Sequence, residues 1–148
     1  MPTVGEIWRH AHFYPDPDTG ELLPKYLLVL GIRADGDVIY RLLTSRAHGR
    51  PTIPPCNHNP PYPSFFLGVI TPGGQLHLDT WLDLREVEDD YDAREFSTDV
   101  GVGALTIVHN LPLHLLCAAL ACAAYAPDTL KRQKNSIMDA RQALGCPA

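Results

Sequence analysis

The chain has 148 residues, of which 45% are hydrophobic and 20% charged, a balance typical of one soluble globular domain with a substantial core. No apolar run approaches the roughly 18 residues of a membrane span, so we expect none, and a net charge of −5 argues against a generally basic nucleic-acid-binding protein. The charge is uneven: residues 25–50 hold five bases and two acids, whereas residues 83–99 hold eight acids and two bases. Either a local basic rim on an acidic body or two ordinary solvated faces would explain this pattern.

The first part of the chain predicts a β-sheet. Residues 4–12 predict an opening strand, and the first ten residues lack the apolar segment of a signal peptide. A loop is expected over residues 14–24, where prolines, aspartates and a glycine gather.

The most distinct pattern is a β-hairpin. Residues 26–32 form a nearly continuous apolar run, as in a strand covered on both faces, and residues 34–37 predict a turn. Residues 38–44 return as the second strand. Antiparallel pairing of these strands would bring Lys25 close to Thr44.

A long irregular segment follows. The six prolines of residues 46–63, the proline-rich loop, exclude a helix or an inner strand, and a loop of this length is usually functional or mobile. Further strands are predicted over residues 64–70 and 75–84, and a short helix over residues 92–99.

The last third of the chain predicts helices. A helix over residues 111–124, capped by Asn110, is apolar nearly all round and should be buried or lie at a subunit interface. Asp128 would cap an amphipathic helix over residues 128–144. Strands followed by helices indicate an α+β fold with a small curled sheet.

The sequence therefore predicts a single domain over residues 1–148. Residues 1–85 would supply the strands and the proline-rich loop, and residues 86–148 would be mostly helical.

The four cysteines form no CxxC motif. They are Cys56, Cys117, Cys122 and Cys146. Cys117 and Cys122 are five positions apart on a predicted helix and would not share a face. We expect reduced thiols in a cytoplasmic protein.

Four short motifs follow one another along the chain. They are Gly5-Glu6-Ile7-Trp8, the strand that begins at Lys25, Thr44-Ser45, and the segment Asp83-Leu84-Arg85-Glu86-Val87. In these motifs, over roughly residues 4–125, the chain resembles the MazF/PemK plasmid-maintenance toxins.

The resemblance implies a small SH3-like β-barrel of about five to six strands, followed by C-terminal helices and usually assembled as a homodimer. It also implies metal-independent cleavage of single-stranded RNA, without a cofactor, and control by a cognate antitoxin. By position, Lys25 corresponds to the phosphate-stabilising arginine of the family. Thr44 corresponds to its catalytic threonine and Asp83 to an acid–base carboxylate.

The chain departs from the family pattern in several places. Lys25 replaces arginine and loses its bidentate fork, and Tyr26 replaces a proline. The proline-rich loop and the last predicted helix are insertions. If the loop overhangs the rim at Thr44, we expect it and its flank to contact substrate.

The residues expected to bind substrate are Ser45, Arg46, His48, Arg50 and Tyr62. Arg50, Tyr62 and Phe65 would be able to stack on bases.

Two other functions fit the sequence. One is a non-catalytic interaction module of the same fold, in which Thr44 merely ends a strand and Asp83 pairs with Arg85 at the surface. The other is a metal-dependent enzyme that uses His48, Cys56 and His58, since thiolate and imidazole are zinc ligands.

Overall fold

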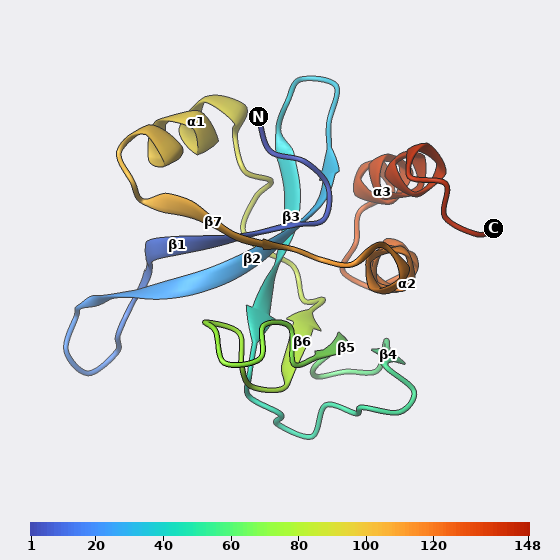
Figure 1. The fold of residues 1–148 in the computed structure, drawn as a ribbon, viewed down its shortest axis with the longest axis horizontal. Coiled ribbons are helices and arrows are strands. Elements are labelled where there is room, and N and C mark those ends of the chain that lie inside the picture. The colour runs from blue at the N-terminus through green and yellow to red at the C-terminus, as the bar shows by residue number, and fades with distance from the viewer.

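The computed structural model describes all of residues 1–148 and consists of seven strands and three helices (Figure 1). The elements in chain order are β1 Glu6–Pro15, β2 Leu22–Ile32, β3 Val38–Thr44, β4 Cys56–Asn57, β5 Ser64–Gly68, β6 Thr80–Asp83, α1 Ala93–Gly101, β7 Leu105–Asn110, α2 Leu113–Ala124 and α3 Lys131–Ala143. This composition confirms the α+β prediction.

The strands form one antiparallel sheet in the order β4-β5-β6-β3-β2-β1-β7. The prediction of a closed barrel is wrong, because β4 and β7 remain as separate edges of an open sheet. β4 has only two residues, and β7 pairs with β1 alone. The expectation that residues 86–148 are mostly helical missed β7, which completes the sheet beyond the N-terminal strand.

The predicted hairpin is confirmed as β2 and β3. Leu27 pairs with Leu42 and Val29 with Tyr40, and the turn contains Gly36 at φ +91°, a conformation that glycine adopts without steric cost. Alternate side chains enter different cores, as a period-2 strand requires. The two faces of β2 are therefore both covered, which explains its uninterrupted apolar sequence.

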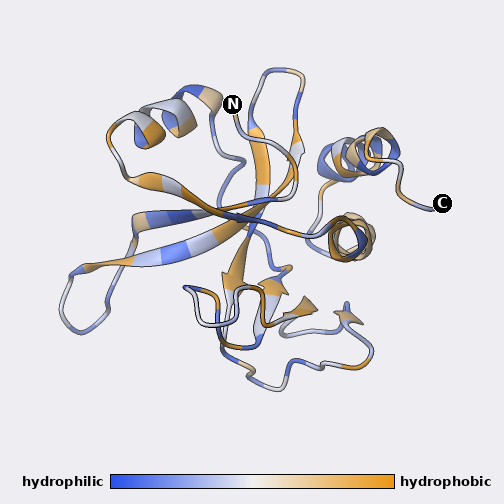
Figure 2. Ribbon diagram, viewed as in Figure 1, coloured by the Kyte–Doolittle hydropathy of each residue, from blue (hydrophilic) through white to orange (hydrophobic).

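Helices cover the two faces of the sheet unequally. α2 and α3 pack with residues such as Leu28 and Leu30 in the larger core, whereas α1 packs through Phe96 against Trp8 and Val29 in the smaller one. Figure 2 shows the hydrophobic residues concentrated along β2, β3 and α2. α2 is mostly buried within its own chain, so its apolar sequence is accounted for by the core.

A buried polar network joins α3 to the sheet. Arg41, only 2% exposed on β3, donates to Gln133 of α3 over 3.3 Å and to the carbonyl oxygen of Tyr40 over 2.9 Å. Gln133 in turn donates to Asp90 over 2.8 Å. An arginine inside an apolar strand is costly unless it is paired, so this network fixes where α3 docks.

Several predicted boundaries are wrong. Asn110 ends β7 and does not cap α2, which begins after Pro112. Asp128 does not cap α3, and its carboxylate accepts from the backbone of Glu86 over 3.2 Å. The strand predicted over residues 75–84 is limited to Thr80–Asp83.

The prediction of reduced cysteines is also wrong. Cys56 is bonded to Cys122 and Cys117 to Cys146, and no cysteine is free. Two different faces of α2 thus hold the proline-rich loop and the C-terminal tail. Disulfides persist mainly in oxidising compartments, so the ground for expecting a cytoplasmic location is lost. None of the three helices is long and apolar enough to traverse a bilayer.

Candidate active-site cleft

One end of the sheet carries a polar cleft of about 320 Å³, here called the cationic cleft. It opens where β2 begins and β3 and β6 end, beneath the proline-rich loop. Its lining residues are Tyr14, Lys25, Thr44, Arg46, His48, Arg50, Tyr62, Asp83 and Arg85.

The cleft brings together seven of the eight residues that the sequence nominated. The eighth, Ser45, lines an adjoining pocket of about 190 Å³ together with Lys25, Thr44 and Arg46. The strand register explains the convergence: the hairpin pairing, continued from Leu27 and Leu42, sets Lys25 opposite Thr44.

Sequence reasoning missed two lining residues. Tyr14 ends the long first strand, where only a loop was expected, and its ring lies 5.5 Å from the Lys25 Nζ. Arg85 was considered only as a surface partner of Asp83. The sequence signal that could have identified Arg85 as a lining residue was its position two residues after Asp83, at the end of a predicted strand.

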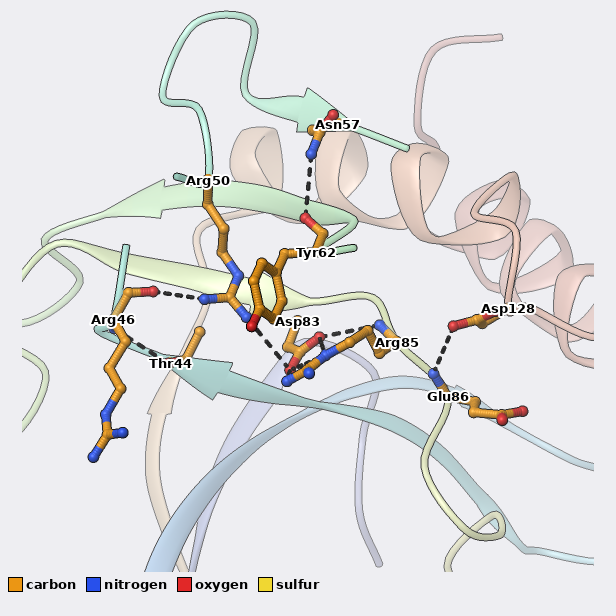
Figure 3. A network of polar contacts seen from close by, with 9 residues as sticks. All are labelled: Thr44, Arg46, Arg50, Asn57, Tyr62, Asp83, Arg85, Glu86 and Asp128. Atoms are coloured by element: carbon orange, nitrogen blue, oxygen red, sulfur yellow. Dashed lines mark hydrogen bonds and ion pairs between the residues drawn. The ribbon is translucent and has the colours of Figure 1, made fainter. Parts of the chain in front are cut away.

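Asp83 is the anchor of the cleft (Figure 3). Its carboxylate accepts from the Arg85 Nη2 over 2.6 Å and Nε over 3.0 Å, and an Arg50 Nη2 lies 3.8 Å away. Burial disfavours the charged carboxylate, but the hydrogen bonds and charge of Arg85, with the charge of Arg50, outweigh burial and lower the Asp83 pKa. A carboxylate held in this way serves better as a fixed counter-charge than as the predicted acid–base group.

Arg50 connects the proline-rich loop to this anchor. Its side chain is 2% exposed, and its Nη1 donates to the Arg46 carbonyl oxygen over 2.7 Å. The guanidinium lies 4.6 Å from the centre of the Tyr62 ring, a cation–π contact. These contacts give Arg50 a structural role in the cleft, and its predicted contact with substrate stays a prediction.

Tyr62 is held from several sides. Asn57 donates to its carbonyl oxygen over 3.2 Å, and Arg85 and His48 lie 5.0 Å and 5.7 Å from the centre of its ring. Arg50, Arg85 and the parallel His48 ring together occupy much of the aromatic surface. Tyr62 is half-buried among these cations, and its predicted stacking on bases stays a prediction. The same prediction for Phe65 is wrong, because its side chain is buried in the core.

The free hydrogen-bond donors lie at the mouth of the cleft. Thr44 Oγ1 accepts from the Arg46 backbone N–H over 3.2 Å, which leaves the hydroxyl proton for another acceptor. Arg46 has an exposed side chain that points away from Asp83 (Figure 3). Burial lowers the Lys25 pKa, the Asp83 charge opposes this shift, and the charge of Arg46 adds to it.

The charge of the cleft is opposite to that of the whole chain. Lys25, Arg46, Arg50 and Arg85 supply four positive charges and Asp83 one negative charge, a local excess of 4 − 1 = +3 against −5 overall. Converging charged donors of this kind bind phosphate or carboxylate oxygens.

The residues of the predicted metal site are separated. His48 lines the cationic cleft and stacks on Tyr62, whereas Cys56 and His58 meet Cys122 of α2. The trio nominated from sequence is thus divided, and a different trio is assembled.

No known protein-family profile, curated protein or solved structure matches this chain. The functional assignment therefore depends on the chemistry of the cationic cleft together with the short motifs of the sequence.

Proposed function

We propose that the protein is a metal-independent endoribonuclease of the MazF/PemK type, which cleaves single-stranded RNA in the cationic cleft. The observation that carries this proposal is the grouping of Lys25, Arg46 and the Thr44 hydroxyl around one opening. These three groups are free to bind an anion, and the Arg50–Asp83–Arg85 network behind them is not.

The proposed reaction is an internal transesterification. The RNA 2′-oxygen attacks the neighbouring phosphorus, the bond from phosphorus to the 5′-oxygen breaks, and the products are a 2′,3′-cyclic phosphate and a 5′-hydroxyl. Lys25 and Arg46 offset the charge that grows on the phosphoryl oxygens, and Thr44 donates to one of them.

The proton lost by the 2′-hydroxyl must reach the leaving 5′-oxygen. Asp83 is tied to two arginines, so His48, which lines the same cleft, is the better candidate for proton exchange, because an imidazole ring has both an acceptor and a donor nitrogen. A cognate antitoxin and a homodimer belong to the same proposal. So does a cytoplasmic location, which follows from the proposed RNA substrate and not from the cysteines.

The test is cleavage of a mixed pool of single-stranded RNA in EDTA. We expect cyclic-phosphate ends, and a loss of about 100-fold in kcat/KM for Lys25→Ala and for Thr44→Ala, the size seen when one transition-state donor is removed. Lys131→Ala on α3 changes an exposed cation outside the cleft and should have no effect.

A non-catalytic binding module is the second candidate. It is favoured by the pairing of Asp83 with Arg85, which leaves the cleft positively charged without a free carboxylate. Such a cleft suits an acidic peptide segment. Folded protein that binds RNA or an acidic peptide at Lys25 but cuts no RNA would replace the nuclease proposal with this one.

A further inference from the structure

A cluster of two cysteines and one histidine lies outside the cationic cleft. Cys56 is on the short edge strand β4, His58 follows it by two residues, and Cys122 is near the end of α2. The His58 Nε2 lies 3.4 Å from the Cys56 Sγ and 3.5 Å from the Cys122 Sγ. The ligand atoms of all three residues lie within 4.8 Å of one another, and the group is partly to fully buried.

Two of the three separations between these ligand atoms match those of a tetrahedral zinc site. Zinc–sulfur bonds of about 2.3 Å and zinc–nitrogen bonds of about 2.0 Å at tetrahedral angles require N···S separations of about 3.5 Å and an S···S separation of about 3.8 Å. Both N···S separations already have that value. The Nε2 now lies 2.9 Å from the Cys122 carbonyl oxygen and would have to leave this contact to bind a metal. The two sulfurs, now bonded to each other, would have to move apart to the separation of two zinc ligands.

The cluster also differs from the other disulfide of α2. The Ser64 carbonyl oxygen lies 3.9 Å from the Cys122 Sγ. The second pair, Cys117 and Cys146, belongs to no comparable group of ligand residues. Two disulfides on one helix thus differ in that only one has an imidazole against both sulfurs.

We propose that Cys56, His58 and Cys122 bind one Zn²⁺ when their disulfide is reduced, with water as the fourth ligand. A phosphine or dithiol reductant supplies two electrons and is itself oxidised, and the disulfide becomes two thiols. Zinc then displaces the two thiol protons and binds both thiolates and the neutral imidazole. The same three residues can therefore link the proline-rich loop to α2 in two ways, through the disulfide or through a shared zinc ion.

The site is also connected to the cationic cleft through one residue. Asn57, between the two ligands of the loop, donates to the carbonyl oxygen of Tyr62. Opening the disulfide without zinc would release the loop that holds Tyr62 and Arg50. The zinc proposal itself does not depend on the nuclease proposal, because it concerns different side chains and a different measurement.

The experiment uses the full chain with Cys117→Ser and Cys146→Ser, so that only Cys56 and Cys122 carry thiols. After phosphine reduction, Zn²⁺ is titrated and bound metal is counted, and Co²⁺ is substituted to detect thiolate ligation by its absorption. We expect one equivalent with thiolate-to-cobalt bands, and at least a 100-fold weaker affinity in Cys56→Ser and His58→Ala. The oxidised chain should show no thiolate bands.

Two results would overturn the proposal. One is a reduced, folded chain that binds no zinc, with folding checked by circular dichroism. The other is zinc binding that survives both Cys56→Ser and His58→Ala. His48→Ala leaves this cluster intact and should bind zinc like the parent, which separates the proposed trio from the one nominated by sequence.

Discussion

Asp83 pairs with two arginines of the cleft, a structural role that goes beyond its predicted acid–base function. Asp83→Asn removes the counter-charge of Arg85 and of the buried Arg50, and we expect it to lower the free energy of unfolding by about 2 kcal/mol at neutral pH. Urea unfolding measures this loss. Asp139→Asn, an exposed aspartate outside any ion pair, is the matched control and should be neutral.

The same substitution has a defined pH dependence. The pKa of Asp83 is lower in the folded chain than its ordinary 3.8, so its stabilising effect is complete above that value and is lost as the pH falls through the folded pKa. The difference between wild type and Asp83→Asn should therefore shrink in acid. A difference that instead grows as the pH falls would contradict the ion-pair account, because protonation of Asp83 removes the charge that pairs with the arginines.

The pH dependence of cleavage tests the proposed role of Lys25. Burial lowers its pKa, so a phosphate-stabilising Lys25 loses its charge as the pH rises, and the cleavage rate should fall on the alkaline side. Lys25→Arg keeps the charge and should remove that fall while retaining cleavage. If the rate rises with pH and Lys25→Arg is inactive, Lys25 acts as a base instead.

At the scale of elements, the sequence predicts what depends on local pattern. The β2–β3 hairpin follows from an apolar run, a turn with Gly36 and a return strand, and its geometry explains why Lys25 and Thr44 meet. β7 was not predicted, although its first four residues, Leu-Thr-Ile-Val, favour a strand. Its partner strand lies about a hundred positions earlier, so nothing in the sequence indicated where β7 would pair.

The two disulfides were not predicted, and the reason is related. Cys56 and Cys122 are 66 positions apart, and Cys117 and Cys146 are 29 apart, so spacing alone could not pair them. Cys117 and Cys122 do lie on different faces of α2, as their spacing indicated. The sequence does not show the paths of the proline-rich loop and the C-terminal tail, which bring a partner cysteine to each face.

The tail disulfide offers a prediction about α3. Closing a loop of 29 positions restricts the unfolded chain, so the double variant Cys117→Ser/Cys146→Ser should lose about 3–4 kcal/mol of stability in the chain-entropy account. Urea unfolding without reductant measures it. The Arg41–Gln133 contact should keep α3 docked, and loss of helical circular dichroism before the main transition would show that this contact is insufficient.

At the scale of the whole molecule, an acidic body surrounds a cleft of opposite sign. The separation of bases and acids seen in the sequence corresponds to a real difference in location: the arginines of residues 46–50 face the cleft. Aspartates and glutamates of residues 86–95 line a different pocket beside β1 and β3. Binding of RNA must therefore be local, since most of the remaining surface repels a polyanion.

That arrangement predicts a weak but measurable dependence of RNA binding on salt. Single-stranded RNA releases about 0.7 counterion per phosphate neutralised, so a cleft with a net charge of +3 should give a slope near −2 in a plot of log K against log salt concentration. Arg46→Ala removes the exposed arginine of the cleft that has no ion-pair partner and should reduce the slope by about 0.7. Lys131→Ala on α3 should leave it unchanged. Equal effects of both variants would mean that RNA is held by the general surface and not by the cationic cleft.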